Sequence, residues 1–159
     1  MQISEKGIDL ITHFEGIKLD AYLDSAKIPT IGYGATFYED GSKVKLGQKI
    51  SPKRAKELLA FHLKKFEDVV KSKVKRPLKQ NEFDAAVSFA FNAGTGYISG
   101  GKRKDYAIWH NIQQDMPDHE ISAYWQGLAI TAGGRVLPGL VRRRKAESFL
   151  YTTGELKYF

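Results

Sequence analysis

The sequence predicts an α+β protein: a small antiparallel sheet lobe and a larger all-helical lobe, joined by one long helix, with a cleft between the lobes. Three observations lead to this prediction. The apolar residues change from a helical period to a period of two before residue 51, one long helical pattern follows, and the remaining patterns are helical. A chain of 159 residues has the length of a single domain.

The composition excludes several classes of protein. The chain has no cysteine, which rules out disulfides, zinc–thiolate sites and cysteine nucleophiles. No run reaches the roughly 18 apolar residues of a membrane span, and the N-terminus lacks the features of a signal peptide, so we expect a soluble protein. The net charge of +7 favours a polyanionic partner: nucleic acid, an anionic membrane face or an acidic cell-wall polymer.

The first helix is expected from Glu5 to Glu15. Ser4 is a favourable N-cap, and Gly16 ends the pattern directly after Glu15. The apolar stripe of this helix consists of Ile8, Leu10, Ile11 and Phe14.

A small antiparallel sheet is expected over about residues 20 to 47. Apolar and polar residues alternate on both sides of the turn sequence SAKIP, and Asp40-Gly41 marks a second turn. A sheet of this size is too small to be stable alone.

Ser51 and Pro52 mark the start of the long helix, which runs to about residue 75 and ends before Pro77. The sheet lobe then covers about residues 16 to 51 and the helical lobe about residues 76 to 159, with the N-terminal helix packed on the helical lobe. The expected core of the helical lobe is Phe83, Val87, Trp109, Trp125, Leu140 and Phe149.

The hairpin carries a candidate water-binding pair. If its turn centres on Lys27, Asp24 faces Thr30 and Tyr22 faces Gly32, because partners then share one face of the ladder. A carboxylate and a hydroxyl so placed can hold one water.

The same face would have no side chain at Gly32 and Gly34, so an extended polymer could lie against the bare backbone there. Tyr22, on the same face, is a candidate sugar contact.

Glu15 is a candidate general acid. It lies at a helix C-terminus, where unpaired carbonyls disfavour a negative charge and so favour the protonated carboxyl. Asp24, in a polar hairpin, can stay ionised. One protonated and one ionised carboxyl is the arrangement of a glycosidase, and a water held by Asp24 and Thr30 points to inversion of the anomeric configuration.

At this spacing the chain also resembles a known family. Glu15, Asp24 and Thr30 match the pattern Glu, eight residues, Asp or Cys, five residues, Thr of the phage-type lysozymes, the endolysin muramidases of glycoside hydrolase family 24 that include the T-even phage lysozyme. "PTIGYG", "FNAG" at residues 91 to 94 and "LPGLVRRRKAE" extend the resemblance over essentially the whole chain. Many relatives have a histidine after "TIGYG", where this chain has Ala35.

The resemblance implies hydrolysis of the β-1,4 bond between N-acetylmuramic acid and N-acetylglucosamine in bacterial peptidoglycan, without a cofactor. Glu15 would protonate the leaving oxygen, and Asp24 and Thr30 would position the water. Phe91 and Asn92 are candidate glycan contacts on the opposite wall. Since the sequence shows no signal peptide, we expect a monomer made in the host cytoplasm. The resemblance implies that it reaches the cell wall through a lesion made by a separate holin-type protein.

Two alternatives remain open from the sequence. One is a catalytically inactive peptidoglycan-binding module of the same fold. The other is a basic nucleic-acid-binding protein, which the absence of any nucleic-acid motif disfavours. The run Arg142 to Lys145 is expected to be a solvated helix face that attracts anionic wall polymers, and the four histidines lack the spacing of metal ligands, so no metal is expected.

Overall fold

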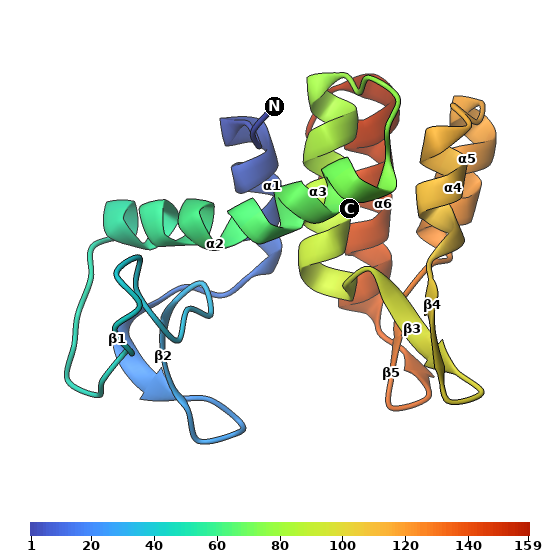
Figure 1. Cartoon of the computed structure of the whole chain (residues 1–159). Coiled ribbons are helices and arrows are strands. Elements are labelled where there is room, and N and C mark those ends of the chain that lie inside the picture. Colours follow the sequence, from blue (N-terminus) through green and yellow to red (C-terminus); the bar gives the residue numbers. More distant parts are fainter.

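A long helix, α2 (Pro52–Lys73), crosses the molecule and connects a sheet lobe to a group of helices (Figure 1). The computed structural model describes all 159 residues. The other helices are α1 (Glu5–Phe14), α3 (Gln80–Ala93), α4 (Ala107–Gln113), α5 (Asp118–Gln126) and α6 (Pro138–Thr153). The strands are β1 (Lys18–Leu23), β2 (Pro29–Gly32), β3 (Gly96–Ser99), β4 (Lys102–Asp105), β5 (Thr131–Ala132) and β6 (Arg135–Val136). The predicted α+β class and the long connecting helix are confirmed.

Local sequence signals set the boundaries of the first two helices. The Ser4 hydroxyl accepts a hydrogen bond from the Gly7 amide, and the Ser51 hydroxyl accepts one from the Arg54 amide. Pro52 occupies the first turn of α2, where its missing N–H costs nothing. None of the helices combines the length and the apolar composition that crossing a bilayer requires.

The sheet lobe depends on α2 for its core. Only β1 and β2 form a ladder there, and isolated bridges such as Phe37 with Lys43 occur beside it. The buried apolar side chains of this lobe are Ile31, Ala35 and Val44, and they pack on Leu58 of α2. Since two short strands cannot bury enough apolar surface alone, the helix supplies the missing side of the core.

The register of this hairpin differs from the predicted one. Tyr22 pairs with Thr30 and Lys18 pairs with Gly32, so Asp24 does not lie opposite Thr30. The cause is the Asp24 carboxylate: its Oδ1 accepts hydrogen bonds from the amides of Ala26 (2.8 Å) and Ile28 (2.9 Å). These bonds close the turn earlier than expected and move its centre from Lys27 to Ala26.

In the helical lobe, α3 lies beside α6 at the centre and the other helices pack around them (Figure 1). Phe83, Val87, Trp109 and Trp125 are buried, as predicted. Two members of the predicted core are wrong: Leu140 and Phe149 are only half-buried, and the inward face of α6 instead presents Ala146, Leu150 and Tyr151 to the core.

Two hairpins extend from the helical lobe. We expected this lobe to be wholly helical. β3 pairs with β4 around Gly100-Gly101, and β5 pairs with β6 around Gly133-Gly134. All four glycines have positive φ, between 57° and 76°. Two consecutive residues with positive φ make the two-residue turn that suits a hairpin, and a Gly-Gly pair adopts it without steric cost. The two Gly-Gly pairs were therefore the sequence signal that indicated these hairpins, and the prediction did not use it.

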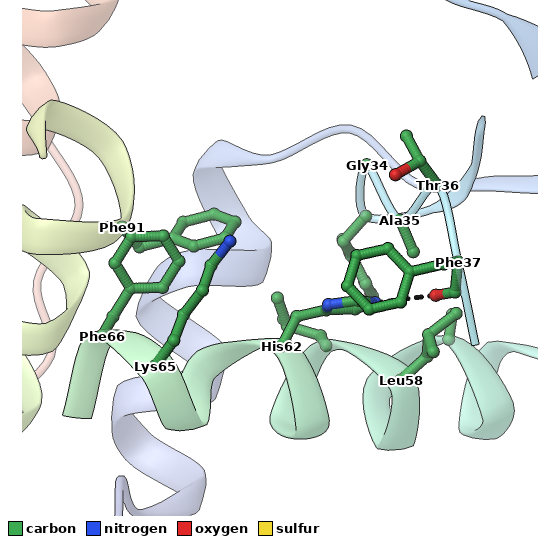
Figure 2. Close-up of a pocket in the computed structure, with 12 residues that line it drawn as sticks. Gly34, Ala35, Thr36, Phe37, Leu58, His62, Lys65, Phe66 and Phe91 are labelled. Atoms are coloured by element: carbon green, nitrogen blue, oxygen red, sulfur yellow. Dashed lines mark hydrogen bonds between the residues drawn. The ribbon is translucent and has the colours of Figure 1, made fainter. Parts of the chain in front are cut away.

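The lobes meet at a pocket of about 160 Å³. Figure 2 shows its walls: Gly34, Ala35 and Phe37 come from the loop after β2, while Phe91 comes from α3 on the far side. Side chains of α2 form the floor between them. The pocket therefore lies between the sheet lobe and the helical lobe, on one side of α2.

We expect Gly7→Ala to lower the free energy of unfolding by about 1–3 kcal/mol, because the new methyl group overpacks the contact between α1 and α3. A Cβ at Gly7 would lie 2.5 Å from Ile3 Cγ1 and 2.9 Å from Asp84 Cβ. At an unhindered helix position the same change would stabilise the protein. Urea unfolding measures the difference. Gly16→Ala is the control, because no atom lies within 4 Å of its Cβ position; an equal loss in both variants would contradict the packing argument.

A second prediction concerns alkaline stability. Burial raises the pKa of Tyr151 from 10.0 to about 12. The neutral phenol therefore adds stability that is complete below pH 10 and is lost as the pH rises towards 12. Tyr151→Phe should remove this part of the alkaline decline. At neutral pH it should cost about 1 kcal/mol, because the phenol oxygen accepts a 3.0 Å hydrogen bond from Arg76 Nη2. Parallel pH dependence of urea unfolding in the two proteins would contradict the assignment.

Candidate active site

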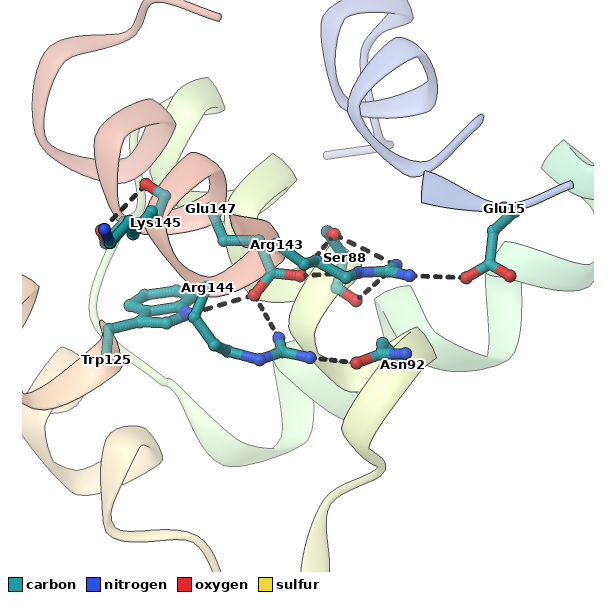
Figure 3. Close-up of polar contacts among 9 residues, drawn as sticks. Glu15, Ser88, Asn92, Trp125, Arg143, Arg144, Lys145 and Glu147 are labelled. Atoms are coloured by element: carbon teal, nitrogen blue, oxygen red, sulfur yellow. Dashed lines mark hydrogen bonds and ion pairs between the residues drawn. The ribbon is translucent and has the colours of Figure 1, made fainter. Parts of the chain in front are cut away.

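Glu15 lies where α1 ends and the chain turns towards the sheet lobe. Its amide still donates to the Ile11 carbonyl, while its own φ and ψ of −90° and 135° are extended. The Glu15 side chain is 29% exposed, and its Oε1 accepts a 2.6 Å hydrogen bond from Arg143 Nη1 of α6 (Figure 3). The carboxyl of Glu15 therefore lies between the carbonyls of the helix end and a buried cation.

The prediction of a solvated face at residues 142 to 145 is wrong for two of its arginines. Arg143 and Arg144 are 3% and 0% exposed, and both donate to Glu147, which is fully buried. Buried cations need such a carboxylate partner. The signal in the sequence was the spacing of Glu147, three and four residues after the arginines on one helix.

Burial lowers the pKa of Arg144, and the nearby Glu147 carboxylate opposes this effect. Its guanidinium also lies 4.8 Å from the centre of the Phe89 ring and donates to the Asn92 side-chain oxygen. Arg144 Nε has no hydrogen-bond partner. This cation is therefore held by one carboxylate, one amide and one aromatic face.

Asp24 and Thr30 are brought together through a single residue, Ile28. The Ile28 amide donates to Asp24 Oδ1 at 2.9 Å, and its carbonyl accepts from the Thr30 hydroxyl at 2.8 Å. Thr30 is 3% exposed, whereas Asp24 is half-buried. The carboxylate and the hydroxyl thus flank one peptide segment, although they are not a cross-strand pair.

The candidate glycan contacts on the helical side fall in two hollows. Glu15, Asn92, Arg142 and Arg143 line a surface groove of about 650 Å³. Phe91 instead lines the pocket between the lobes, where its ring packs edge-to-face on Phe66. Asn92 therefore shares a hollow with the candidate acid, while Phe91 faces the sheet lobe.

The predicted bare strand face is wrong for Gly32. This residue is buried, and a Cβ there would meet Ile50 at 3.3 Å and Ala55 at 3.6 Å, so its open side faces α2. Gly34 is exposed and lines the pocket between the lobes. Tyr22 is half-buried on β1, opposite Thr30, and lines neither hollow.

The pocket that Ala35 lines also contains a histidine from its other side. His62 of α2 lines the same pocket, and its Nε2 lies 2.9 Å from the Phe37 carbonyl oxygen (Figure 2), which requires the proton on Nε2. The imidazole also packs edge-to-face on the Phe37 ring. The histidine that links the sheet lobe to α2 is therefore His62 of the helix, and residue 35 is an alanine.

The arrangement offers acid–base chemistry. A carboxyl fixed by a cation opens onto a groove of the helical lobe. A second carboxyl and a hydroxyl, those of Asp24 and Thr30, lie on the sheet lobe and line neither this groove nor the pocket between the lobes. Such a pair can protonate one atom of a substrate and orient a water at another. No group of three His, Asp or Glu residues is placed to hold a metal ion.

The comparisons with known proteins find phage lysozymes and endolysins. The sequence model of the family described as phage lysozyme matches residues 12–147. The chain is 38% identical over 159 residues to the endolysin of Bacillus phage B103, covering 99% of this chain and 56% of that protein. The chain thus spans little more than half the length of that relative.

Two solved structures resemble the whole chain. An endolysin from Escherichia coli O157:H7 phage FAHEc1 has a TM-score of 0.80 at 36% identity, with 99% of this chain and 97% of the other covered. A mutant of P22 lysozyme has a TM-score of 0.80 at 35% identity, with 95% and 98% covered. The resemblance therefore includes both lobes.

The turn at Asp24 predicts a difference between two substitutions. Asp24→Asn keeps an oxygen that can accept from the Ala26 and Ile28 amides, whereas Asp24→Ala leaves both without this partner. We expect Asp24→Ala to lower the free energy of unfolding by about 1 kcal/mol more than Asp24→Asn does. Urea unfolding of both variants tests this. Equal stabilities would show that the carboxylate does not hold the turn.

Proposed function

The chain belongs to the phage lysozyme family, and from that premise we propose that it is a muramidase that hydrolyses the β-1,4 bond between N-acetylmuramic acid and N-acetylglucosamine in peptidoglycan. Phage lysozymes are glycoside hydrolases.

The observation that carries the proposal is the setting of Glu15. Its carboxylate is partly exposed at a groove and is bonded at 2.6 Å to a cation that is itself 3% exposed. When Glu15 gives its proton to the leaving oxygen, it becomes a carboxylate beside Arg143. The buried guanidinium stabilises the charge that develops there, which is an interaction stronger in the transition state than in the ground state.

Asp24 acts as the general base in this proposal. With the Thr30 hydroxyl, it holds the water that attacks the anomeric carbon from the face opposite the leaving group, which inverts the configuration. The Ile28 peptide supports this role, because it fixes both side chains through hydrogen bonds of 2.9 and 2.8 Å. Asn92 contacts the glycan in the groove, and Phe91 and Gly34 contact it in the pocket between the lobes.

The protein acts on the host cell wall and causes lysis. In this proposal it is a monomer that accumulates in the host cytoplasm and reaches the wall when a separate holin-type protein opens the membrane. Its net charge of +7 favours approach to anionic wall polymers.

The first test compares the parent protein with Glu15→Gln and Asp24→Asn. We expect the parent to clear a suspension of outer-membrane-permeabilised Gram-negative cells and to release reducing sugar from purified peptidoglycan. Each substitution preserves shape and removes an ionisable group, so each should lower the rate by about 10²–10⁴-fold. Proton NMR of the first product formed should show the inverted anomer.

Circular dichroism and urea unfolding establish that the variants are folded. Glu155→Gln is the matched control, because this glutamate follows α6 and lines neither hollow; its rate should equal that of the parent. A folded parent that binds peptidoglycan but releases no reducing sugar would overturn the proposal in favour of a binding module.

A further inference from the structure

We propose that Glu147 is the positioning residue of this site: one buried carboxylate aligns both the candidate acid, Glu15, and the candidate glycan contact, Asn92, through two neighbouring arginines. This inference rests on the proposed function and adds a residue that does not touch the substrate. It gives a role to the charged run of α6, for which we expected a solvated face.

Glu147 has the contacts of an anchored group. Its Oε1 accepts hydrogen bonds from Ser88 Oγ at 2.7 Å and from Arg143 Nε at 3.2 Å. Its Oε2 accepts from Trp125 Nε1 at 3.1 Å and from Arg144 Nη1. The side chain is fully buried, and its partners come from α3, α5 and α6. Because four donors from three helices bind it, this carboxylate is held in one position.

From Glu147 the contacts divide into two branches (Figure 3). Arg143 uses Nε on Glu147 and Nη1 on Glu15, at 3.2 and 2.6 Å. Arg144 uses Nη1 on Glu147 and Nη2 on the Asn92 oxygen. A guanidinium is planar and rigid, so fixing one edge fixes the direction of the other. One buried group therefore determines where Glu15 and Asn92 lie in the groove.

The charge of the cluster gives Glu147 a second effect. Arg143 and Arg144 carry two positive charges behind the groove, and Glu147 compensates one of them. Without this compensation, Glu15 would face a more positive cluster, which stabilises a negative carboxylate. The other titratable or charged groups that line the groove beside Glu15 are His13, Arg142 and Arg143. Glu147 thus holds the acid in place and limits the positive charge beside it.

The experiment measures the pH dependence of kcat and kcat/KM on purified peptidoglycan for the parent and for Glu147→Gln. The glutamine is isosteric but uncharged. We expect kcat to fall by about tenfold or more, because the acid is misplaced. The descending, alkaline limb of the pH profile should move to lower pH by about 0.5–1 unit, because the net positive charge near Glu15 has increased.

Glu82→Gln is the matched control. Glu82 is another buried carboxylate of the same lobe, 7% exposed, and its Oε2 lies 3.2 Å from Arg76 Nη1, outside both hollows. Its substitution should lower stability and leave the pH profile unchanged. A Glu147→Gln profile that coincides with the parent profile would overturn the inference, and so would an equal displacement in both variants.

Ser88→Ala keeps the test decisive if Glu147→Gln does not fold. It removes the 2.7 Å hydrogen bond to Glu147 Oε1 and changes no charge. We expect kcat to fall by about twofold to fivefold, since the alignment of Glu15 is affected. The alkaline limb of the pH profile should stay at the same pH, because no charge changes. An unchanged kcat would overturn the positioning role. A parent without hydrolytic activity would instead overturn the proposed function, so the two failures are distinguishable.

Discussion

Two guanidinium groups inside the helical lobe constrain the rest of this structure. A buried cation is stable only with a carboxylate and further acceptors around it, and removing one partner from such a group costs about 3–5 kcal/mol. Arg143 and Arg144 find these partners in three places: Asn92 and the Phe89 ring on α3, Glu15 at the end of α1, and Glu147 on their own helix. The cluster therefore fixes how α1, α3 and α6 sit relative to one another.

The same cluster links stability to chemistry. Glu15 is its most exposed charged member and opens onto the groove. The carboxylate that would act on substrate is thus the outermost part of a network whose inner members are held by packing. Such an arrangement gives a reactive side chain a fixed direction without burying it, which is the condition for orienting an acid towards one bond.

The sheet lobe is positioned by a different means. Its small core is completed by Leu58 of α2, and His62 of the same helix bonds to the Phe37 carbonyl. The lobe with Asp24 and Thr30 is therefore attached to the connecting helix, while Glu15 is attached to the helical lobe. The two candidate catalytic carboxylates belong to different bodies that meet along α2, so the geometry of their pair depends on that helix.

The sequence alone determined the features that depend on neighbouring residues. Ser4, Ser51 and Pro52 predicted the helix starts, because capping involves residues three positions apart. The period of the apolar residues predicted the fold class, and the spacing of Glu15, Asp24 and Thr30 indicated the family. Local patterns carry this information because helix and turn formation is a short-range process.

Tertiary structure decided the rest. The bond from Arg143 to Glu15 joins residues 128 positions apart, and no local pattern contains it. The burial of Arg144 depended on Asn92 and Phe89 of another helix. A buried polar group takes its partners from whatever the fold places beside it, so its role becomes visible only when the packing is known.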